Sequence, residues 1–505
     1  MNANIAEYLR ATALRRGEAV ALIFGGDSLT WSELNERVDA LAAGLILRGL
    51  HAGDRVALML GNGPDFVMAY FACARAGLVT VPLNPAYTSP EIAVLLADSE
   101  ARLLIVESDT RQVGVDAAAA LPGCEVVCTA DDDWRSIFAE GSNVTLAEAA
   151  TAPESLALLL FTAGTSGRPK GAMLTHGALR ANIDMLLALD SPAAVREDDI
   201  VLAVLPMFHV YGLNTVLGLA VAAGATCVIT DRFDPEQCAD LIAQHRITTV
   251  AGAPGMYQAW CFTPGLRERM ATVRLLSSGG APLPARVFDT FQEVSGLAIY
   301  EGYGMTEAAP VVATTLVSGA PKVGSVGRPL AGLDIRLADE DGGEVDDGDP
   351  GELWVRGPSV FRGYWPDAVG GPDAEGWFHS GDVAYLDDDG DLHLVDRRRE
   401  VILVNGFNVY PREIELAIED LDGVAETAVV GIPDDRTGEA VLAFVVPRRG
   451  SSITVDDVRA HCAGRLARFK CPTVVRIVEA LPHSTTGKVA KGRLRDVHGE
   501  FGFGT

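Results

Sequence analysis

The chain has 505 residues, of which 48% are hydrophobic and 22% are charged, so we expect a globular protein with two or more domains. Its formal net charge of −27 argues against nucleic acid and anionic lipid surfaces as main partners, because both would be repelled. Eight irregularly spaced cysteines fit neither a disulfide framework nor a zinc ribbon. The amino terminus has no apolar segment of signal-peptide length, so we expect a cytoplasmic protein with at most peripheral membrane contact.

The first part of the chain predicts alternating helices and strands. Thr30 and Glu33 form a T-x-x-E capping box, and apolar residues then recur at helical spacing. The following residues predict strands at 55–60, 79–82 and 103–106, and helices at 65–76 and 90–98, the last opened by Ser89. Helices and strands that alternate in this way imply a parallel sheet.

The stretch FTAGTSGRPKG, residues 161–171, follows an apolar run that predicts a buried strand. Gly164 and Gly167 permit positive φ and a close approach of the backbone to a ligand, so the N–H groups and hydroxyls of this loop would form a phosphate cradle. It is not the common nucleotide P-loop, because Gly171 instead of Ser or Thr follows Lys170. On this stretch alone, a surface turn rich in Gly, Ser and Thr remains an alternative.

Later stretches also run from apolar residues into turns rich in Gly and Pro, at 202–210, 250–254, 275–282 and 299–307. Ligands in open parallel sheets bind at such carboxyl ends of strands. His209 follows the first of these predicted strands, where it could cap a pocket, although a histidine in apolar surroundings is more often a packed core residue. The uncharged run 210–230 is long enough to raise the question of a membrane span, and we interpret it as a buried helix, a turn at Gly224 and a strand.

The stretch IYEGYGMTE, residues 299–307, places two glycines beside an aromatic residue, a hydroxyl and a carboxylate. Tyr303 could stack on a flat ring, Thr306 could bond a phosphate oxygen, and Glu307 could hold a magnesium ion. A loop that joins two strands would explain this sequence equally well.

Residues 324–395 consist of short alternating segments that predict antiparallel β structure, with a hairpin at Asp389 and Gly390. Within them Asp382 could accept bonds from two ribose hydroxyls, or lie in a solvated turn. The charged run DRRRE, residues 396–400, predicts a domain boundary.

The remaining residues predict a small domain with helices at 412–420 and 455–466 and strands at 427–432 and 440–446. Lys488 lies near its end in a polar loop, where a lysine is ordinarily only solvated.

Together, these stretches resemble the adenylate-forming superfamily and, within it, the acyl-CoA synthetases. The motifs that carry the resemblance, in chain order, are FTAGTSGRPKG, LPMFHVYG, SSGGAP, EGYGMTE, GWFHSGD, DRRREVILVNGFNVYP and TTGK. The resemblance implies an α/β fold with a large N-terminal domain of mixed and parallel sheets sandwiched by helices, plus a β-rich subdomain. It places this domain at 1–396 and a small mobile α+β C-terminal domain at 397–505, with a hinge near Arg399.

The resemblance also implies ATP, Mg²⁺ and coenzyme A as ligands and assigns residues to them. The phosphates would be bound by Thr162, Gly164, Thr165, Ser166, Gly167 and Lys170. Adenine and the adjoining phosphate would contact Gly280, Ala281, Pro282, Glu301, Gly302, Tyr303, Gly304, Met305 and Thr306. The other assigned groups are Asp382 and Arg397 for ribose, Asn405 and Gly406 in a loop that enters for the second step, Glu307 and Thr162 for magnesium, and Lys488, Glu307, Thr306 and His209 for catalysis.

The chemistry of such enzymes explains these residue types. A carboxylate attacks the α-phosphorus of ATP, so cations must be directed at two groups that repel each other; Lys488 would contact both and hold them in line. The thiol of coenzyme A then attacks the acyl-AMP. Between the two steps the small domain would rotate, withdrawing Lys488 and bringing in residues 405–407.

His209 would face the acyl group, and Gly212, Gly218 and Gly224 would leave room beside it for a tunnel. Because each buried methylene contributes ~0.8 kcal/mol, an apolar tunnel predicts a medium- or long-chain fatty acid as substrate. The alternatives are a ligase that stops at acyl-AMP or loads a carrier protein, an aryl-CoA ligase, and a non-catalytic acyl or nucleotide binder. The sequence leaves open whether the protein is a monomer or a homodimer.

The chain departs from the family pattern at four positions. Ala163 stands where a serine is usual, and Arg399 where a lysine or aspartate is usual. Leu403 and Asn405 replace lysines that many aryl-CoA ligases carry, which weakens the aryl alternative.

Overall fold

The computed structural model describes residues 3–144, 151–162, 169–339, 341–346, 348–397, 400, 402–404, 407–434, 438–466, 468–483 and 489–494. The chain forms two compact units, Met1–Ile335 with Val355–Phe378 and Arg336–Trp354 with His379–Thr505. This division groups part of the β-rich region with the C-terminal residues. The boundary at 396/397 stays a prediction.

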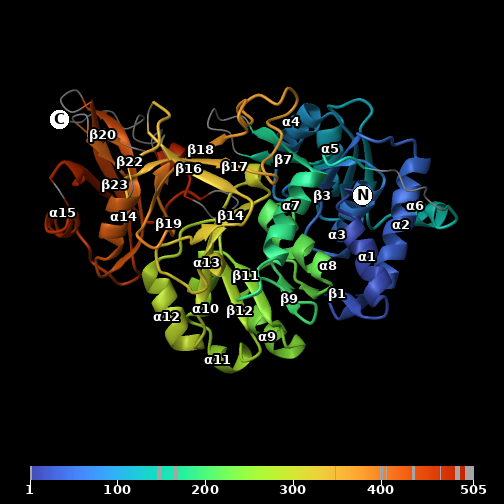
Figure 1. The fold of residues 1–505 in the computed structure, drawn as a ribbon, viewed down its shortest axis with the longest axis horizontal. Coiled ribbons are helices and arrows are strands. Elements are labelled where there is room, and N and C mark those ends of the chain that lie inside the picture. The colour runs from blue at the N-terminus through green and yellow to red at the C-terminus, as the bar shows by residue number, and fades with distance from the viewer. Residues whose placement is uncertain are drawn as a thin grey trace. The chain divides into compact units, whose positions relative to one another are not determined.

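The first unit contains a six-stranded sheet (Figure 1). Its strands are β3 (Arg55–Met59), β4 (Val79–Pro82), β5 (Ala101–Val106), β6 (Glu125–Cys128), β7 (Leu156–Thr162) and β8 (Lys170–Thr175). They lie in the order β6-β5-β3-β4-β7-β8, and all neighbours are parallel except the antiparallel pair β7 and β8. The parallel sheet predicted from the alternation of helices and strands is therefore confirmed.

The same unit contains a nine-stranded sheet in the order β15-β14-β13-β12-β11-β9-β10-β1-β2. Its strands are β1 (Val20–Phe24), β2 (Asp27–Thr30), β9 (Ile200–Ala203), β10 (Thr226–Ile229), β11 (Thr249–Gly252), β12 (Leu275–Ser278), β13 (Ile299–Gly304), β14 (Val311–Thr314) and β15 (Arg328–Pro329). The central strands from β13 to β1 are parallel, and the outer pairs are antiparallel. β12 and β13 are neighbouring parallel strands, and β12 ends at Ser278 opposite Glu301 of β13.

Helices accompany both sheets. They are α1 (Glu7–Arg16), α2 (Trp31–Leu47), α3 (Pro64–Arg75), α4 (Ser89–Ser99), α5 (Arg111–Ala118), α6 (Asp132–Gly141), α7 (His176–Leu187), the π-helix η1 (Tyr211–Gly218), α8 (Leu219–Ala223), α9 (Pro235–His245), α10 (Pro254–Trp260), α11 (Leu266–Arg269), α12 (Ala285–Ser295), the 3₁₀-helix η2 (Thr306–Ala308) and α13 (Thr315–Ser318). The predicted capping box of α2 is confirmed, since Thr30 and Glu33 make both reciprocal bonds. For α4 the cap is Thr88, which pairs with Glu91, and not Ser89 as predicted; Ser89 is the first helical residue.

The uncharged run 210–230 has the predicted order of helix, turn and strand. It forms η1, α8 and β10, and Gly224 ends α8 with φ +88°. In the described part of the chain, no helix combines the length and the hydropathy needed to cross a membrane.

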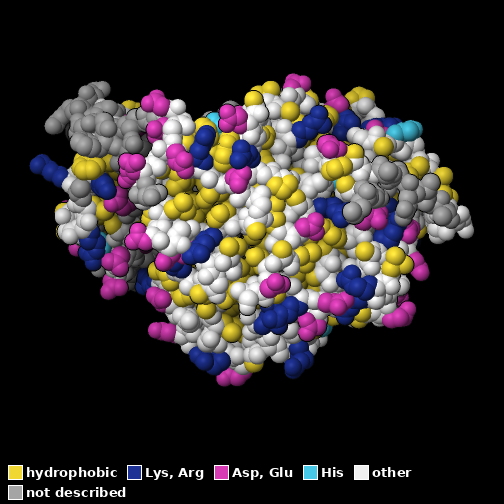
Figure 2. Space-filling model, viewed as in Figure 1, with side chains coloured by type: hydrophobic (Ala, Val, Ile, Leu, Met, Phe, Trp, Pro, Cys, Tyr) yellow, Lys and Arg dark blue, Asp and Glu magenta, His cyan; other side chains and the backbone are white. Residues whose placement is uncertain are grey.

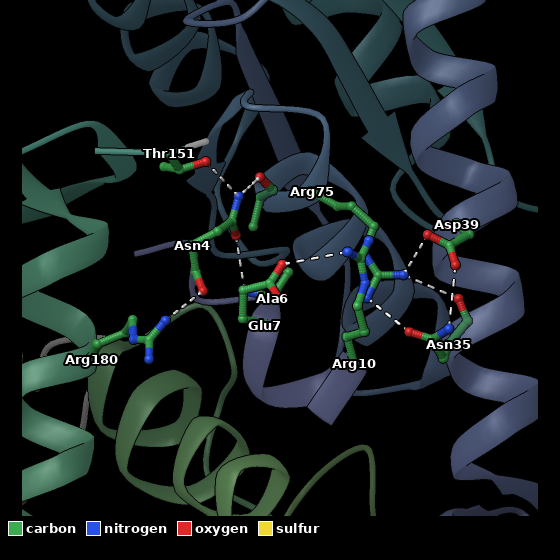
Figure 3. Close-up of polar contacts among 10 residues, drawn as sticks. Asn4, Ala6, Glu7, Arg10, Asn35, Asp39, Arg75, Thr151 and Arg180 are labelled. Atoms are coloured by element: carbon green, nitrogen blue, oxygen red, sulfur yellow. Dashed lines mark hydrogen bonds and ion pairs between the residues drawn. The ribbon is translucent and has the colours of Figure 1, made fainter. Parts of the chain in front are cut away.

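Polar contacts fix the N-terminal segment to the first unit (Figure 3). Asn4 Nδ2 donates to the Ala74 carbonyl at 2.6 Å, and Arg180 donates to the Asn4 carbonyl at 3.3 Å. The Ile5 N–H donates to Nδ1 of His176 at 3.1 Å. The segment therefore contacts both α3 and α7.

The second unit holds most of a four-stranded sheet and a five-stranded sheet. The four-stranded sheet consists of β16 (Asp334–Ala338), β17 (Gly351–Arg356), β18 (Phe378–Leu386) and β19 (Leu392–Arg397), in that order. The antiparallel pair β18 and β19 confirms the hairpin predicted at Asp389 and Gly390.

The five-stranded sheet has the order β21-β20-β23-β22, with β24 parallel beside β23. This part contains β20 (Ile402–Val404), β21 (Phe407–Val409), α14 (Pro411–Glu419), β22 (Val424–Asp434), β23 (Gly438–Pro447), α15 (Val455–Ala463), η3 (Arg468–Lys470) and β24 (Val474–Ile477). Alternate residues of β23 belong to two separate buried clusters, with Val441 and Val445 in one and Leu442 and Phe444 in the other. Both faces of this sheet are therefore covered.

These features confirm the predicted α/β class, with mainly parallel sheets in the larger part and a smaller C-terminal part. All eight cysteines lie in the described part of the chain and are free. On the face shown in Figure 2, acidic and basic side chains are interspersed.

Candidate active site

The glycine-rich stretch connects two antiparallel strands. β7 and β8 pair up to Thr162 opposite Lys170, and Thr162 Oγ1 donates to the Lys170 carbonyl at 3.4 Å. A hairpin differs from the nucleotide P-loop, in which the lysine begins a helix. The predicted phosphate ligands between the two strands, Gly164, Thr165, Ser166 and Gly167, lie outside the described residues, as does Ala163.

Tyr364 connects Lys170 to Glu307. Lys170 Nζ lies 5.2 Å from the centre of the Tyr364 ring, and Tyr364 Oη donates to Glu307 Oε1 at 2.6 Å. Burial, followed by the nearby charge of Glu307, raises the pKa of Tyr364, so its hydroxyl keeps the proton that it donates. The structure thus brings together the predicted phosphate-binding lysine and the predicted magnesium-binding carboxylate.

Backbone pairing with β8 holds Tyr364 in position. Gly363 accepts a bond from the Met173 N–H at 3.0 Å, and the Trp365 N–H donates to the Gly171 carbonyl at 2.8 Å. Tyr364 itself forms an antiparallel bridge with Ala172. Sequence reasoning missed this residue, because the pairing joins segments almost 200 residues apart and FRGYWPD has no feature that separates it from an ordinary turn.

The predicted adenine-binding residues lie at the carboxyl ends of two neighbouring strands. Ser278 at the end of β12 is paired with Glu301 in β13, and Tyr303 follows two residues later in the same strand. The residues after β12 are exposed, namely Gly280, Ala281 and Pro282. Tyr303 is only 9% exposed, so most of its ring is covered by the protein.

Packing within the protein accounts for the residue types at two further predicted binding positions, Glu301 and Gly304. Glu301 is 7% exposed, and its N–H donates to Thr315 Oγ1 at 2.8 Å. At Gly304 a Cβ would lie 2.3 Å from the Pro310 carbonyl oxygen, so only glycine fits there. Gly302 and Met305 flank this contact, and their assignment to the nucleotide stays a prediction.

His209 lies in the turn after β9, partly buried, with its ring centre 4.7 Å from that of Phe208. The strand that precedes it ends at Ala203 and is shorter than the sequence predicts. The residues that follow begin η1, and the ring of Tyr211 covers Gly279, where a Cβ would be 3.2 Å from two ring carbons. The segment that follows β9 therefore contributes three aromatic rings, those of Phe208, His209 and Tyr211.

The expectation that three glycines leave room for a tunnel is wrong. A Cβ at Gly212 would lie 2.3 Å from the Pro206 carbonyl oxygen, and one at Gly218 would lie 2.9 Å from Ile183 Cδ1. At Gly224 a Cβ would lie 2.9 Å from an Arg15 nitrogen. At each of these positions neighbouring protein atoms occupy the space of a side chain, so the missing side chains do not leave room for a tunnel.

The predicted ribose ligands, Asp382 and Arg397, are directly opposite each other in β18 and β19. Asp382 is partly buried, and its N–H donates to Ser380 Oγ at 3.1 Å. Of the other predicted residues, Lys488, Arg399, Asn405 and Gly406 lie outside the described residues.

Glu307 offers a suitable ligand for magnesium. Its carboxylate supplies the hard oxygen that Mg²⁺ prefers, and Tyr364 bonds only one of its two oxygens. Among the described residues, Glu307 belongs to no cluster of three potential metal ligands. The residues therefore fit a magnesium ion that takes one carboxylate from the protein and completes its coordination with phosphate oxygens and water.

Known proteins resemble this chain along nearly its whole length. The model of the AMP-binding enzyme family matches residues 9–365, and that of the AMP-binding enzyme C-terminal domain matches residues 413–488. A feruloyl-CoA synthase of Amycolatopsis sp is 40% identical over 486 residues, which cover 94% of this chain and 95% of the relative. A long-chain-fatty-acid–CoA ligase of Yersinia pestis is 32% identical over 529 residues, covering 98% and 94%. The ATP-bound crystal structure of MatB from Rhodopseudomonas palustris is 33% identical, with a TM-score of 0.91 and 99% of both chains covered.

Proposed function

Since this chain belongs to the AMP-binding enzymes of the adenylate-forming superfamily and is an AMP-forming acyl-CoA ligase, we propose that it acts on an aromatic carboxylic acid related to ferulic acid. The carboxylate attacks the α-phosphorus of ATP, and pyrophosphate leaves as acyl-AMP forms. The thiol of coenzyme A then attacks the acyl carbon, and AMP leaves as the thioester forms.

The observation that carries the adenylation step is the contact series Lys170, Tyr364 and Glu307. Lys170 supplies positive charge at the end of the hairpin, where we place the phosphates of ATP. Tyr364 holds Glu307 in one orientation. Magnesium bound to Glu307 would neutralise charge on the departing pyrophosphate. Lys488 is proposed to contact the carboxylate and the α-phosphate.

Two observations support an aromatic acid. The feruloyl-CoA synthase is the more similar of the two relatives described above, and it matches over almost its whole length. In addition, the Phe208 and His209 rings contact each other and the Tyr211 ring lies against Gly279, so the segment that we assign to the acyl group supplies three aromatic rings. Flat rings favour the stacking of another aromatic group.

A medium- or long-chain fatty acid is the second candidate, because the ligase from Yersinia pestis also matches along nearly the whole chain. Leu403 and Asn405, which replace lysines of many aryl-CoA ligases, favour this candidate. The fatty-acid candidate is weakened because Gly212, Gly218 and Gly224 do not leave room for an acyl tunnel.

Separate assays of pyrophosphate and thioester test the proposal. The protein is incubated with ATP, Mg²⁺ and coenzyme A, and with ferulate, benzoate, octanoate or palmitate. We expect the highest kcat/KM for thioester formation with ferulate. A preference for octanoate or palmitate would establish the fatty-acid candidate. Pyrophosphate without thioester would indicate a ligase that stops at acyl-AMP or loads a carrier protein, and neither product with any acid would indicate a non-catalytic binder.

We further propose a hinge near Arg399, next to a domain boundary between residues 396 and 397. We also propose a cytoplasmic location, which the eight free cysteines support. Small-angle scattering with and without ATP would test the rotation, and size-exclusion chromatography with light scattering would decide between monomer and homodimer.

A further inference from the structure

Two buried asparagines hold the segment that directly follows Glu307. Asn182 lies in α7 and is 0% exposed, and Asn214 lies in η1 and is 1% exposed. Asn182 occupies the apolar face of α7 together with Leu179, Ile183 and Leu186, where an apolar residue would be expected. A buried amide at such a position has to find hydrogen-bond partners inside the protein.

Both asparagines find them in the backbone after η2. Asn182 Nδ2 donates to the Val311 carbonyl at 2.8 Å and to the Ala308 carbonyl at 3.4 Å, and its Oδ1 accepts from the Val311 N–H at 3.2 Å. Asn214 Nδ2 donates to the Ala309 carbonyl at 2.7 Å and to the Leu179 carbonyl at 3.0 Å. The two side chains thus hold three carbonyl groups within four residues of Glu307.

This segment has a backbone that needs such support. Ala309 adopts φ +68°, in the left-handed region that residues other than glycine seldom occupy. The Ala308 and Ala309 carbonyls point to side chains from two different helices and make no regular ladder. The amide orientations are fixed as well, because a rotated Asn214 would direct its oxygen at two carbonyl oxygens.

We propose that Asn182 and Asn214 are positioning residues, which act through the backbone of residues 308–311 to keep the Glu307 carboxylate against Tyr364 and directed at the magnesium–phosphate group. This inference rests on the proposed function. Asn214 belongs to the π-helix that begins two residues after His209, and its side chain bonds the Ala309 carbonyl. This residue therefore connects the helix after His209 to the turn after Glu307. π-helical turns are frequent at functional sites.

The test replaces each asparagine by aspartate. Asn182→Asp and Asn214→Asp keep the size of the side chain, remove both N–H donors and turn a carboxylate oxygen toward the carbonyls. Asn4→Asp is the matched control, because Asn4 is also buried and its Nδ2 also donates to a backbone carbonyl, that of Ala74, in the N-terminal segment. Milder versions, Asn182→Ser and Asn214→Ser, retain one hydroxyl donor and serve if an aspartate variant does not fold.

Direct titration measures the affinity for ATP with Mg²⁺ and with EDTA, in the absence of any acid substrate. We expect each site variant to weaken the binding of MgATP about tenfold or more, the scale of one or two lost hydrogen bonds to a shared segment, and to change the binding of free ATP less. Hydrogen exchange of residues 304–312 should accelerate. Asn4→Asp should lower the thermal midpoint while leaving the ratio of the two affinities unchanged.

A double-mutant cycle separates positioning from general damage. If the asparagines act through Glu307, their effect on MgATP binding disappears in a Glu307→Gln background. Folded variants with the MgATP affinity and exchange rates of the wild type would overturn the inference, and so would effects that persist undiminished beside Glu307→Gln. A wild-type protein that binds no MgATP would instead overturn the proposed function, and this inference with it.

Discussion

His176, the first residue of α7, should make the stability of the protein depend on pH. It is 1% exposed, and its Nδ1 accepts a bond from the Ile5 N–H, so the ring is held in its neutral form. Burial, and then the positive charge of Arg180, lowers the pKa of His176 from 6.5 to about 4. Between these values the unfolded chain binds a proton that the folded chain does not, so stability falls as the pH drops from about 6.5 toward 4.

The size of this effect follows from the two pKa values. At about 1.36 kcal/mol for each pKa unit, the unfolding free energy should fall by about 3 kcal/mol across the window on account of His176 alone. His176→Asn keeps an acceptor for the Ile5 N–H and cannot be protonated. Because carboxylates titrate in the same range, the quantity to measure is the difference between wild type and variant.

Denaturant unfolding of both proteins at several pH values from 4 to 7 provides this difference. We expect the wild type to lose about 3 kcal/mol more than His176→Asn over the range. His51→Asn serves as the control for the loss of a surface histidine, since the side chain of His51 is 80% exposed. A difference between wild type and His176→Asn that does not change with pH would refute a buried neutral histidine at this position.

Three further substitutions test the site and its packing. Tyr364→Phe removes the donor to Glu307, and since a bond to a charged group contributes ~1.5–3 kcal/mol, the affinity for MgATP in a direct titration should fall roughly 10- to 100-fold; an unchanged affinity would contradict the role given to Tyr364. Gly212→Ala places a Cβ against the Pro206 carbonyl and should destabilise the protein by roughly 1–3 kcal/mol, so a wild-type thermal midpoint would argue against the close packing. Lys488→Ala should slow acyl-AMP formation by ~10² or more and largely preserve thioester formation from supplied acyl-AMP. Equal loss of both half-reactions would contradict that role for Lys488.

Local signals made much of the fold predictable. The capping box at Thr30 and Glu33 and the apolar spacing after it involve neighbours in the sequence, and they located α2 correctly. β4 and the helix–turn–strand order of residues 210–230 followed in the same way. A signal of this kind lies within one or two turns of the chain, so it can be recognised in the sequence without knowledge of tertiary contacts.

Errors arose where a residue type permits two physical explanations. Gly212 and Gly218 are small either because a ligand needs space or because backbone segments approach closely, and only the structure shows that Pro206 and Ile183 fill the space. The π-helical geometry of η1 was likewise invisible, since the apolar run is compatible with an α-helix of the same composition.

The candidate site was predictable only in part. Lys170 and Glu307 belong to recognisable motifs, whereas Tyr364 reaches them through pairing at the edge of β8. Asn182 carried a weak signal as a polar residue in an apolar stripe, and Asn214 stood in a similar context. Such residues bond backbone atoms far away in the sequence, and one sequence alone does not show these contacts.

The β7–β8 hairpin has a consequence for engineering. Thr162 and Lys170 are the last paired residues of its ladder, so the strand register is set before the intervening peptide begins. A replacement peptide of different length that joins the same two residues would change the entropy of loop closure only slightly. Loops from other nucleotide-using ligases could therefore be transplanted here, and the scaffold would tolerate a library of them.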